Sequence, residues 1–191
     1  VFDRDEKMTA TDAMNRADIM FNVDKMPLFI ELPTGEHIPT SSYSVVREPT
    51  VDDPEYRVLA SVGKEWTAIQ ATELGKMLDP ITARYPDETA GAIGRGEKIF
   101  ISLDAGESKI AGEDHNLFYL VSDARDGTGA LNIAFTPVRV VCQNTLVAGL
   151  NNAKVSISIK HNKNIRTDAE FYLDIFNQMA SVKDTIVSAM D

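Results

Sequence analysis

The sequence lacks several features that would assign it to a class at once. One cysteine in 191 residues excludes an internal disulfide. There is no apolar run of the length that spans a membrane, and the first residues lack the basic and then apolar order of a secretory signal. The three histidines do not lie at metal-ligand spacing from one another or from the cysteine. These absences favour a soluble, intracellular protein without a zinc site.

The composition is that of an ordinary globular chain, with 43% apolar and 25% charged residues. Its length suits one domain and would be cramped for two. We therefore expect a single domain over residues 1–191, in which 1–40 form a helix and edge segments, 41–163 the central core, and 164–191 a C-terminal helix. The chain begins without methionine and ends inside a helical pattern, as a fragment of a longer protein would.

Charge is distributed unevenly along the chain. The net charge of −10 argues at first against nucleic acid, because phosphate binding depends on lysine and arginine. Between Ala124 and Arg166, however, six basic residues accompany one acidic residue, a local charge of +5 that leaves −15 for the rest. The six are Arg125, Arg139, Lys154, Lys160, Lys163 and Arg166. This predicts a basic face on an acidic body, although the basic residues could also simply share a solvated surface.

Three segments show helical signals. Thr9 as N-cap with Asp12 three residues later predicts a short first helix. The apolar spacing of residues 71–86 predicts a second helix, which Pro80 should kink or end. Residues 167–190 open with a Thr167 to Glu170 capping box and predict a long C-terminal helix, which can pack on a sheet or meet a partner chain.

Alternating apolar residues predict antiparallel strands joined by glycine turns. Residues 56–62 read as a strand that starts a hairpin, and strand patterns recur in residues 88–105, 116–137 and 153–162. Residues 105–116 read as a polar loop. Prolines 27, 33 and 39 reduce residues 22–48 to edge strands or loop. The expected fold class is α+β, an antiparallel sheet of hairpins packed by three to four helices.

Residues 136–150 predict one more helix, with Thr136 as N-cap and Pro137 at the first helical position. Its apolar stripe would contain Val138, Val141, Cys142, Thr145, Leu146 and Leu150, and its outer face Arg139, Gln143 and Asn144. Cys142 is then expected to be a buried thiol rather than a reactive one. A nucleophile and base formed by Cys142 and His161, with Asn144 orienting the base, remains an alternative.

The strand in residues 153–162 carries the predicted binding face. Val155, Ile157 and Ile159 should point inward, and Lys154, Ser156, Ser158 and Lys160 outward. Small hydroxyls beside basic side chains suit a phosphate backbone. The predicted nucleic-acid-binding residues are Arg125, Arg139, Gln143, Asn144, Lys154, Lys160, His161, Lys163 and Arg166. Trp66, the only tryptophan, is either a stacking platform or part of the core.

Other chemistry has weaker support in the sequence. "GAIGRGEK" lacks the Ser or Thr that follows the lysine of a phosphate loop, and a turn explains its glycines. Asp123 and Asp126 in "SDARDG" could hold a cation, but a turn ending in Gly127 needs no ion. We expect no catalytic residues, no metal and no cofactor.

The stretches "VGKEWTAIQATEL", "ETAGAIGRGEKIFISL" and "SDARDGTGALNIAFTPVRVVCQNTL" resemble a phage and plasmid family described only as a domain of unknown function (family nine-three-two). The resemblance runs from about Tyr43 to His161. It implies a mobile genetic element in a bacterial cytoplasm, and it brings no established activity. In layout the chain also resembles phage single-strand annealing proteins, which implies rings or filaments that bind DNA in an outer groove without cofactors.

The expected function is that of a non-enzymatic protein of a phage or mobile element. It would bind nucleic acid, with single-stranded DNA favoured, as a homo-oligomer in recombination or replication, and no membrane is involved. The alternative is a protein-interaction module whose acidic body mimics DNA and antagonises a host-defence protein.

Overall fold

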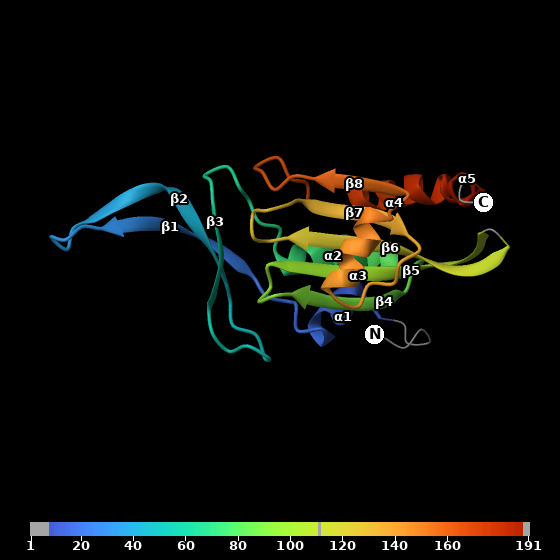
Figure 1. Ribbon diagram of the computed structural model, residues 1–191, viewed down its shortest axis with the longest axis horizontal. Coiled ribbons are helices and arrows are strands. Elements are labelled where there is room, and N and C mark those ends of the chain that lie inside the picture. The colour runs from blue at the N-terminus through green and yellow to red at the C-terminus, as the bar shows by residue number, and fades with distance from the viewer. Residues whose placement is uncertain (1–7, 111, 189–191) are drawn as a thin grey trace.

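The computed structural model describes residues 8–110 and 112–188, and it has the α+β architecture expected from the sequence (Figure 1). Its strands form two antiparallel sheets. The first sheet contains β1 (Val23–Glu31), β2 (His37–Arg47) and β3 (Arg57–Val62) in chain order. The second contains β4 (Asp87–Ile93), β5 (Lys98–Ile110), β6 (Glu113–Ala124), β7 (Leu131–Thr136) and β8 (Val155–Ile159), also in chain order. Successive hairpins therefore build both sheets.

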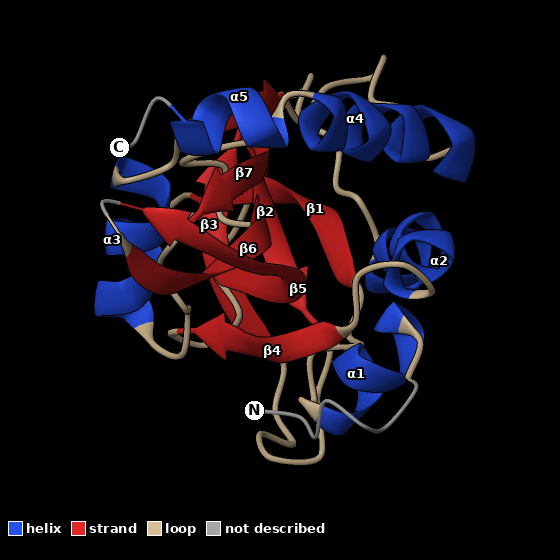
Figure 2. Cartoon of the chain, turned by 90° about the vertical axis from the view of Figure 1, so that its right-hand side faces the viewer, coloured by secondary structure: helices blue, strands red, loops and turns tan. Residues whose placement is uncertain are grey.

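Helices cover both faces of the five-stranded sheet (Figure 2). One face carries α1 (Ala10–Arg16), α2 (Ala71–Thr82) and α4 (Ala169–Ser181), where α2 packs against the other two. The opposite face carries α3 (Gln143–Asn151), which contacts β7. Alternation along β6 separates the two layers, because Tyr119 and Val121 join the larger core and Leu120 joins the smaller core under α3.

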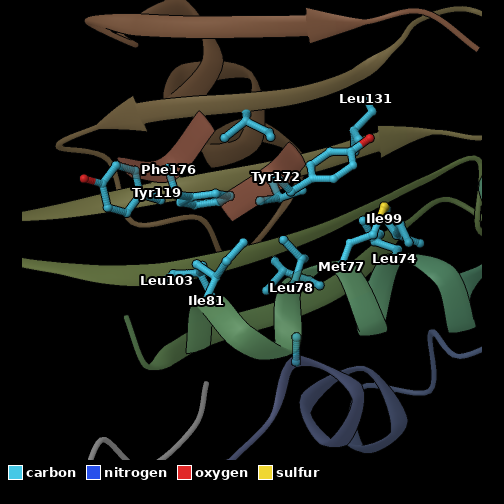
Figure 3. Close-up of a cluster of buried hydrophobic side chains, with 14 of the residues drawn as sticks. Leu74, Met77, Leu78, Ile81, Ile99, Leu103, Tyr119, Leu131, Tyr172 and Phe176 are labelled. Carbon is cyan, nitrogen blue, oxygen red and sulfur yellow. The ribbon is translucent and has the colours of Figure 1, made fainter. Parts of the chain in front are cut away.

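The larger core lies between α2, α4 and the sheet (Figure 3). Leu74, Met77, Leu78 and Ile81 lie on one side of α2, and all four are fully buried. They face side chains of the sheet and of α4, which include Ile99, Leu103, Tyr119, Tyr172 and Phe176. Tyr119 makes edge-on contact with Phe176 at 5.3 Å between ring centroids. The apolar spacing in residues 71–85 thus correctly predicted the core-facing side of α2.

Several boundaries follow the sequence signals. Thr9 accepts a hydrogen bond from the Asp12 amide, and the Asp12 side chain accepts from Thr9, so the predicted capping box opens α1. The turn at Gly94–Gly96 joins β4 to β5, and both glycines have positive φ. Pro80 lies inside α2, which continues to Thr82 instead of ending near Asp79. Its position in the last turn removes little of the helical hydrogen bonding.

The prediction of a polar loop at residues 105–116 was wrong. β5 and β6 continue their ladder to the Ile110–Glu113 pair, with an irregularity between Asp104 and Gly106. This outer part of the hairpin is mostly exposed, so its side chains are polar although its backbone is regular. The expected hairpin after β3 is also absent, because the turn at Gly63 leads through residues 65–70 directly to α2.

The prediction for the start of α3 was wrong as well. Thr136 ends β7, and its hydroxyl accepts a hydrogen bond from the Val138 amide. Helix α3 begins seven residues later, with Cys142 as N-cap. Thr145 fixes this start, because its hydroxyl accepts hydrogen bonds from the amides of Val141 and Cys142. Val141 and Cys142 are consequently exposed and do not belong to an apolar stripe.

The C-terminal helical segment differs from a single long helix. Asp168, rather than Thr167, is the N-cap of α4, where its carboxylate accepts from the Phe171 amide. Helix α4 ends at Ser181, and a second helix, α5 (Lys183–Ser188), follows. The Lys183 ammonium donates to the Ala105 carbonyl at 2.5 Å. This hydrogen bond attaches the start of α5 to β5. Residues 189–190 of the predicted helix lie outside the described residues.

Candidate nucleic-acid interface

Strand β8 has the two faces that the sequence predicted. Val155, Ile157 and Ile159 pack against the larger core. Lys154, Ser156, Ser158 and Lys160 are exposed on the other face, which is the face that α3 covers in part. The chain has no acidic residue between Asp126 and Asp168, so positive charge along this strand is not compensated locally in sequence. The result is a basic outer edge of the five-stranded sheet.

An open cleft of about 470 Å³ lies at the end of β8. Three segments that are distant in the chain form it: the loop after β3, the β6–β7 turn and the end of β8. The lining residues are Trp66, Gly127, Thr128, Gly129, Ala130, Asn132, Ser158, Lys160 and His161. Gly127 has φ +72°, and a Cβ there would lie 2.5 Å from Val62, so the turn lies too close to β3 for another residue.

Trp66 has one of the two roles that the sequence left open, that of a core residue, and its role as a stacking platform stays a prediction. The indole packs against the larger core and also lines the cleft. Its ring stacks on His161, with 5.6 Å between the ring centroids and 29° between the planes. The indole nitrogen is buried without a hydrogen-bond partner among the described residues. An aromatic face held in this way is a suitable surface for a flat ligand.

His161 lines the cleft with a ring that is buried between two acceptors. Its Nε2 lies 2.8 Å from an Asp123 carboxylate oxygen, and its Nδ1 lies 3.1 Å from the Thr67 carbonyl oxygen. Both neighbours are acceptors, so both ring nitrogens are best protonated. Burial alone would lower the pKa of His161, but the Asp123 carboxylate and the Thr67 carbonyl raise it above its usual value. The His161 side chain is therefore occupied by internal partners and is not free to bind phosphate.

Arg125 was predicted as a phosphate contact, and the structure contradicts this, because the residue is 1% exposed. Its guanidinium lies 3.1 Å from Asp123 and donates to the Phe21 carbonyl at 2.9 Å. It also lies over the Phe21 ring, as does Arg47 on β2. Arg125 is thus part of a buried network that joins the two sheets, in which Asp123 serves both Arg125 and His161.

The remaining predicted residues do not gather in the cleft. Gln143 lines a second cavity, of about 260 Å³, on the other side of the β6–β7 turn, and exposed Asn144 follows it in α3. Arg139 is exposed on the extended segment before α3. Lys163 is exposed in the loop after β8. Arg166 is bound to Asp168 at 2.7 Å and stacks on Phe171, so its charge is largely compensated.

Cys142 is exposed, which contradicts the expected buried thiol. The Thr145 hydroxyl and the first amides of α3 lower the pKa of Cys142. The alternative of a Cys142–His161 pair is contradicted too. His161 binds Asp123 on the face of the sheet that α1, α2 and α4 cover, whereas Cys142 precedes α3 on the opposite face. Asp126 accepts from the Thr128 amide and hydroxyl, which is the expected turn. In the described parts of the chain, no three His, Cys, Asp or Glu side chains come together to hold a metal ion.

Sequence reasoning missed Thr128 and Asn132 as residues of the cleft. It located the turn at Asp126–Gly129 but gave no reason to place that turn beside Trp66 and Lys160. The Asn132 side chain accepts a hydrogen bond from Ser158, which couples β7 to the exposed face of β8. Long-range proximity of this kind depends on the order of the strands, and a pattern within one segment does not encode it.

The architecture is an α+β scaffold with a basic outer edge and an adjacent open cleft. Residues 58–191 match the family described as Domain of unknown function (DUF932), and the chain belongs to this family. The match begins later than Tyr43 and continues past His161 through the helices α4 and α5. No curated protein and no solved structure matches the chain. Among the described helices, none is long and apolar enough to span a membrane.

Proposed function

We propose that this protein binds nucleic acid, with single-stranded DNA as the preferred form, and acts without enzymatic activity in recombination or replication of a phage or other mobile element. It does so as a homo-oligomer in the cytoplasm of a bacterial host. The observation that carries the proposal is the continuity of the basic outer face of β8 with the cleft at its end. Lys154 and Lys160 flank two small hydroxyls, and Trp66 lies in the cleft that follows.

The arrangement suits an unpaired strand better than a duplex. Lysines along a strand contact phosphates without reading sequence, and small serines let the backbone approach closely. A base of an unpaired nucleotide can enter the cleft and contact the indole of Trp66, whereas a paired base is held in its stack. Lys160 lines the same cleft and can bind the phosphate of that nucleotide. The exposed lysine Lys163 follows in the next loop and extends the positive surface.

The test is fluorescence anisotropy with labelled single-stranded and duplex DNA over a salt series. We expect saturable binding that is stronger for the single strand and weakens with salt. The double charge reversal Lys160→Glu and Lys163→Glu should reduce affinity at least about tenfold and lower the salt slope by about two, one for each lost phosphate contact. The same reversal at Lys76 on α2 and Lys109 on β5 is the matched control, since both are exposed away from this face.

Trp66 provides a direct second readout, because it is the only tryptophan in the chain. Stacking of a base should quench its fluorescence in proportion to the anisotropy signal. An unchanged affinity and salt slope in the Lys160 and Lys163 variant would remove this face from consideration. The absence of any binding at low salt would direct attention to the acidic body as a surface for a host protein.

A further inference from the structure

The outer part of the β1–β2 hairpin, residues 26–41, projects from the body as an arm (Figure 1). Its residues from 28 onward lie beyond the last residue pair that β2 makes with β3, Tyr43 with Val62, so among the described strands only β1 and β2 support that part of the arm. Four large apolar side chains in it are 43–57% exposed: Met26, Phe29, Ile30 and Ile38. A two-stranded hairpin is marginally stable by itself, and exposed apolar residues grouped on it mark a surface that another molecule covers.

The strand register places apolar side chains on both faces of the arm. Ile30 pairs with Ile38, and both therefore lie on one face. Phe29 pairs with Pro39, and their side chains lie on the other face. A partner therefore buries the most apolar surface by packing against the side chains of the arm, and not by adding a strand to the hairpin.

The edges of the arm support side-chain docking as well. At its base, the backbone amide and carbonyl of Val23 are bound by the Gln70 side chain. Further out, each strand contains a proline, Pro27 in β1 and Pro39 in β2. A proline within a strand has no N–H for pairing and is tolerated where that side of the strand faces solvent. Addition of another strand along either edge is therefore disfavoured.

Charge identifies a matching surface on the same chain. Residues 26–41 contain two acidic residues, Glu31 and Glu36, and no lysine or arginine. Residues 137–154, which include α3, contain Arg139 and Lys154 and no acidic residue. In that segment Val141 and Val147 are each about half exposed. An apolar surface with acidic residues in its own segment thus has a counterpart whose own segment is apolar and basic, and the cavity beside Val147 is lined in addition by Glu97, Lys98 and Asp126.

The arm and α3 are far apart along the longest axis of one molecule, so they can meet only between copies (Figure 1). We propose that the arm of one copy docks on the α3 surface of a second copy, around Val141 and Val147. The two surfaces differ, so the contact is head-to-tail and generates a ring or a filament. This inference rests on the homo-oligomer of the proposed function and assigns the surfaces through which its subunits meet.

The native cysteine gives a direct test. Cys142 is exposed beside Val141, at the start of α3. In an Ile30→Cys protein, oxidation should form a disulfide between the arm of one copy and Cys142 of the next, visible as a ladder of multimers on a non-reducing gel. The Ile30→Cys protein that also carries Cys142→Ser should give no ladder. Lys109→Cys, near the tip of the β5–β6 hairpin, is a control for random collision and should give none.

Light scattering provides the complementary measurement on proteins without added cysteine. Wild-type protein should form multimers of the 21.0 kDa chain, and Ile30→Asp should shift them to monomer without lowering the thermal midpoint, because Ile30 is exposed. Three results would overturn the proposal: a monomeric wild type at micromolar concentration, an unchanged mass for Ile30→Asp, or Ile30→Cys products that persist after Cys142→Ser, which indicate contact between two arms.

The same variants separate this inference from the proposed function. Ile30→Asp should keep its affinity for a short oligonucleotide that fills one cleft, since Ile30 is not among the residues that line the cleft. The Lys160→Glu and Lys163→Glu protein should keep its multimeric mass while losing DNA. A wild-type protein that assembles but does not bind DNA therefore counts against the proposed function alone, and one that binds the oligonucleotide but stays monomeric counts against the arm contact.

Discussion

Asp87 is the clearest single-residue source of pH dependence. Its carboxyl group is buried, and neither oxygen has a hydrogen-bond partner among the described residues. Burial, together with the charges of Asp79 and Asp12, raises its pKa from 3.8 to about 7. The folded protein holds this proton over a range in which the unfolded chain releases it. The contribution of Asp87 to stability is therefore complete below pH 3.8 and is lost as the pH rises through about 7.

We expect the free energy of unfolding to fall by about 2–3 kcal/mol between roughly pH 4.5 and pH 6.5 because of this group. Urea titrations across that range measure it. Asp87→Asn should flatten the profile, while Asp114→Asn, at an exposed position on β6, should leave it unchanged. A wild-type slope that persists in Asp87→Asn would show that Asp87 ionises normally in the folded protein. His161 contributes at higher pH, because its raised pKa stabilises the fold below 6.5 and this stabilisation is lost above.

At the scale of elements, local signals predicted what local hydrogen bonds decide. The Thr9 and Asp12 pair fixed the start of α1, and the alternation in β8 fixed which side chains face the core. The start of α3 was missed because Pro137 after a threonine is also compatible with the end of a strand, and Thr145 decides between the two. The outer hairpin of β5 and β6 was missed because polarity reports exposure and does not distinguish an exposed strand from a loop.

The packing of α1 on α2 depends on a glycine within a helix. An added Cβ at Gly75 would lie 2.6 Å from the Thr11 hydroxyl and 3.4 Å from its Cα. Thr11 cannot easily move, because its amide and hydroxyl both donate to Asp79 at 2.8 Å. The close approach therefore outweighs the gain of about 1 kcal/mol that alanine has over glycine in a helix.

Gly75→Ala should lower the free energy of unfolding by about 1–3 kcal/mol, as overpacking of a core does. Chemical denaturation of the purified variant measures this. Gly63→Ala is the matched control, since no described residue has an atom within 4 Å of a Cβ at that position. Equal stability of the Gly75→Ala and wild-type proteins would mean that α1 shifts on α2 at little cost.

At the scale of the whole molecule, the sequence predicted the class of fold and the basic outer strand, but it could not assemble the cleft. Trp66, Thr128 and Lys160 come from three separate segments, and only the meander of the strands brings them together. The same limit explains Arg125, whose charge suggested a surface position until the Asp123 and Phe21 partners were known. Net charge along a segment indicates a tendency and does not place individual side chains.

The family match begins at residue 58, yet the fold extends further toward the N-terminus. Ala10, Met14 and Phe21 are buried in the larger core, and Phe21 lies between the buried guanidinium groups of Arg47 and Arg125. We expect a protein of residues 58–191 alone to lack cooperative unfolding, because it loses these side chains and leaves Arg125 without its carbonyl partner. Circular dichroism during urea titration measures this.

An arm-shortened protein is the control that separates the arm from the core. Replacing residues 27–43 by Asn-Gly keeps the Met26–Ser44 pair and closes the hairpin with a two-residue turn. Of the described residues that this removes, Tyr43 alone packs against the core, so the loss of stability should not exceed about 2 kcal/mol. Full cooperative unfolding of residues 58–191 would contradict the argument, since it would make the first 57 residues an accessory to a core that is complete without them.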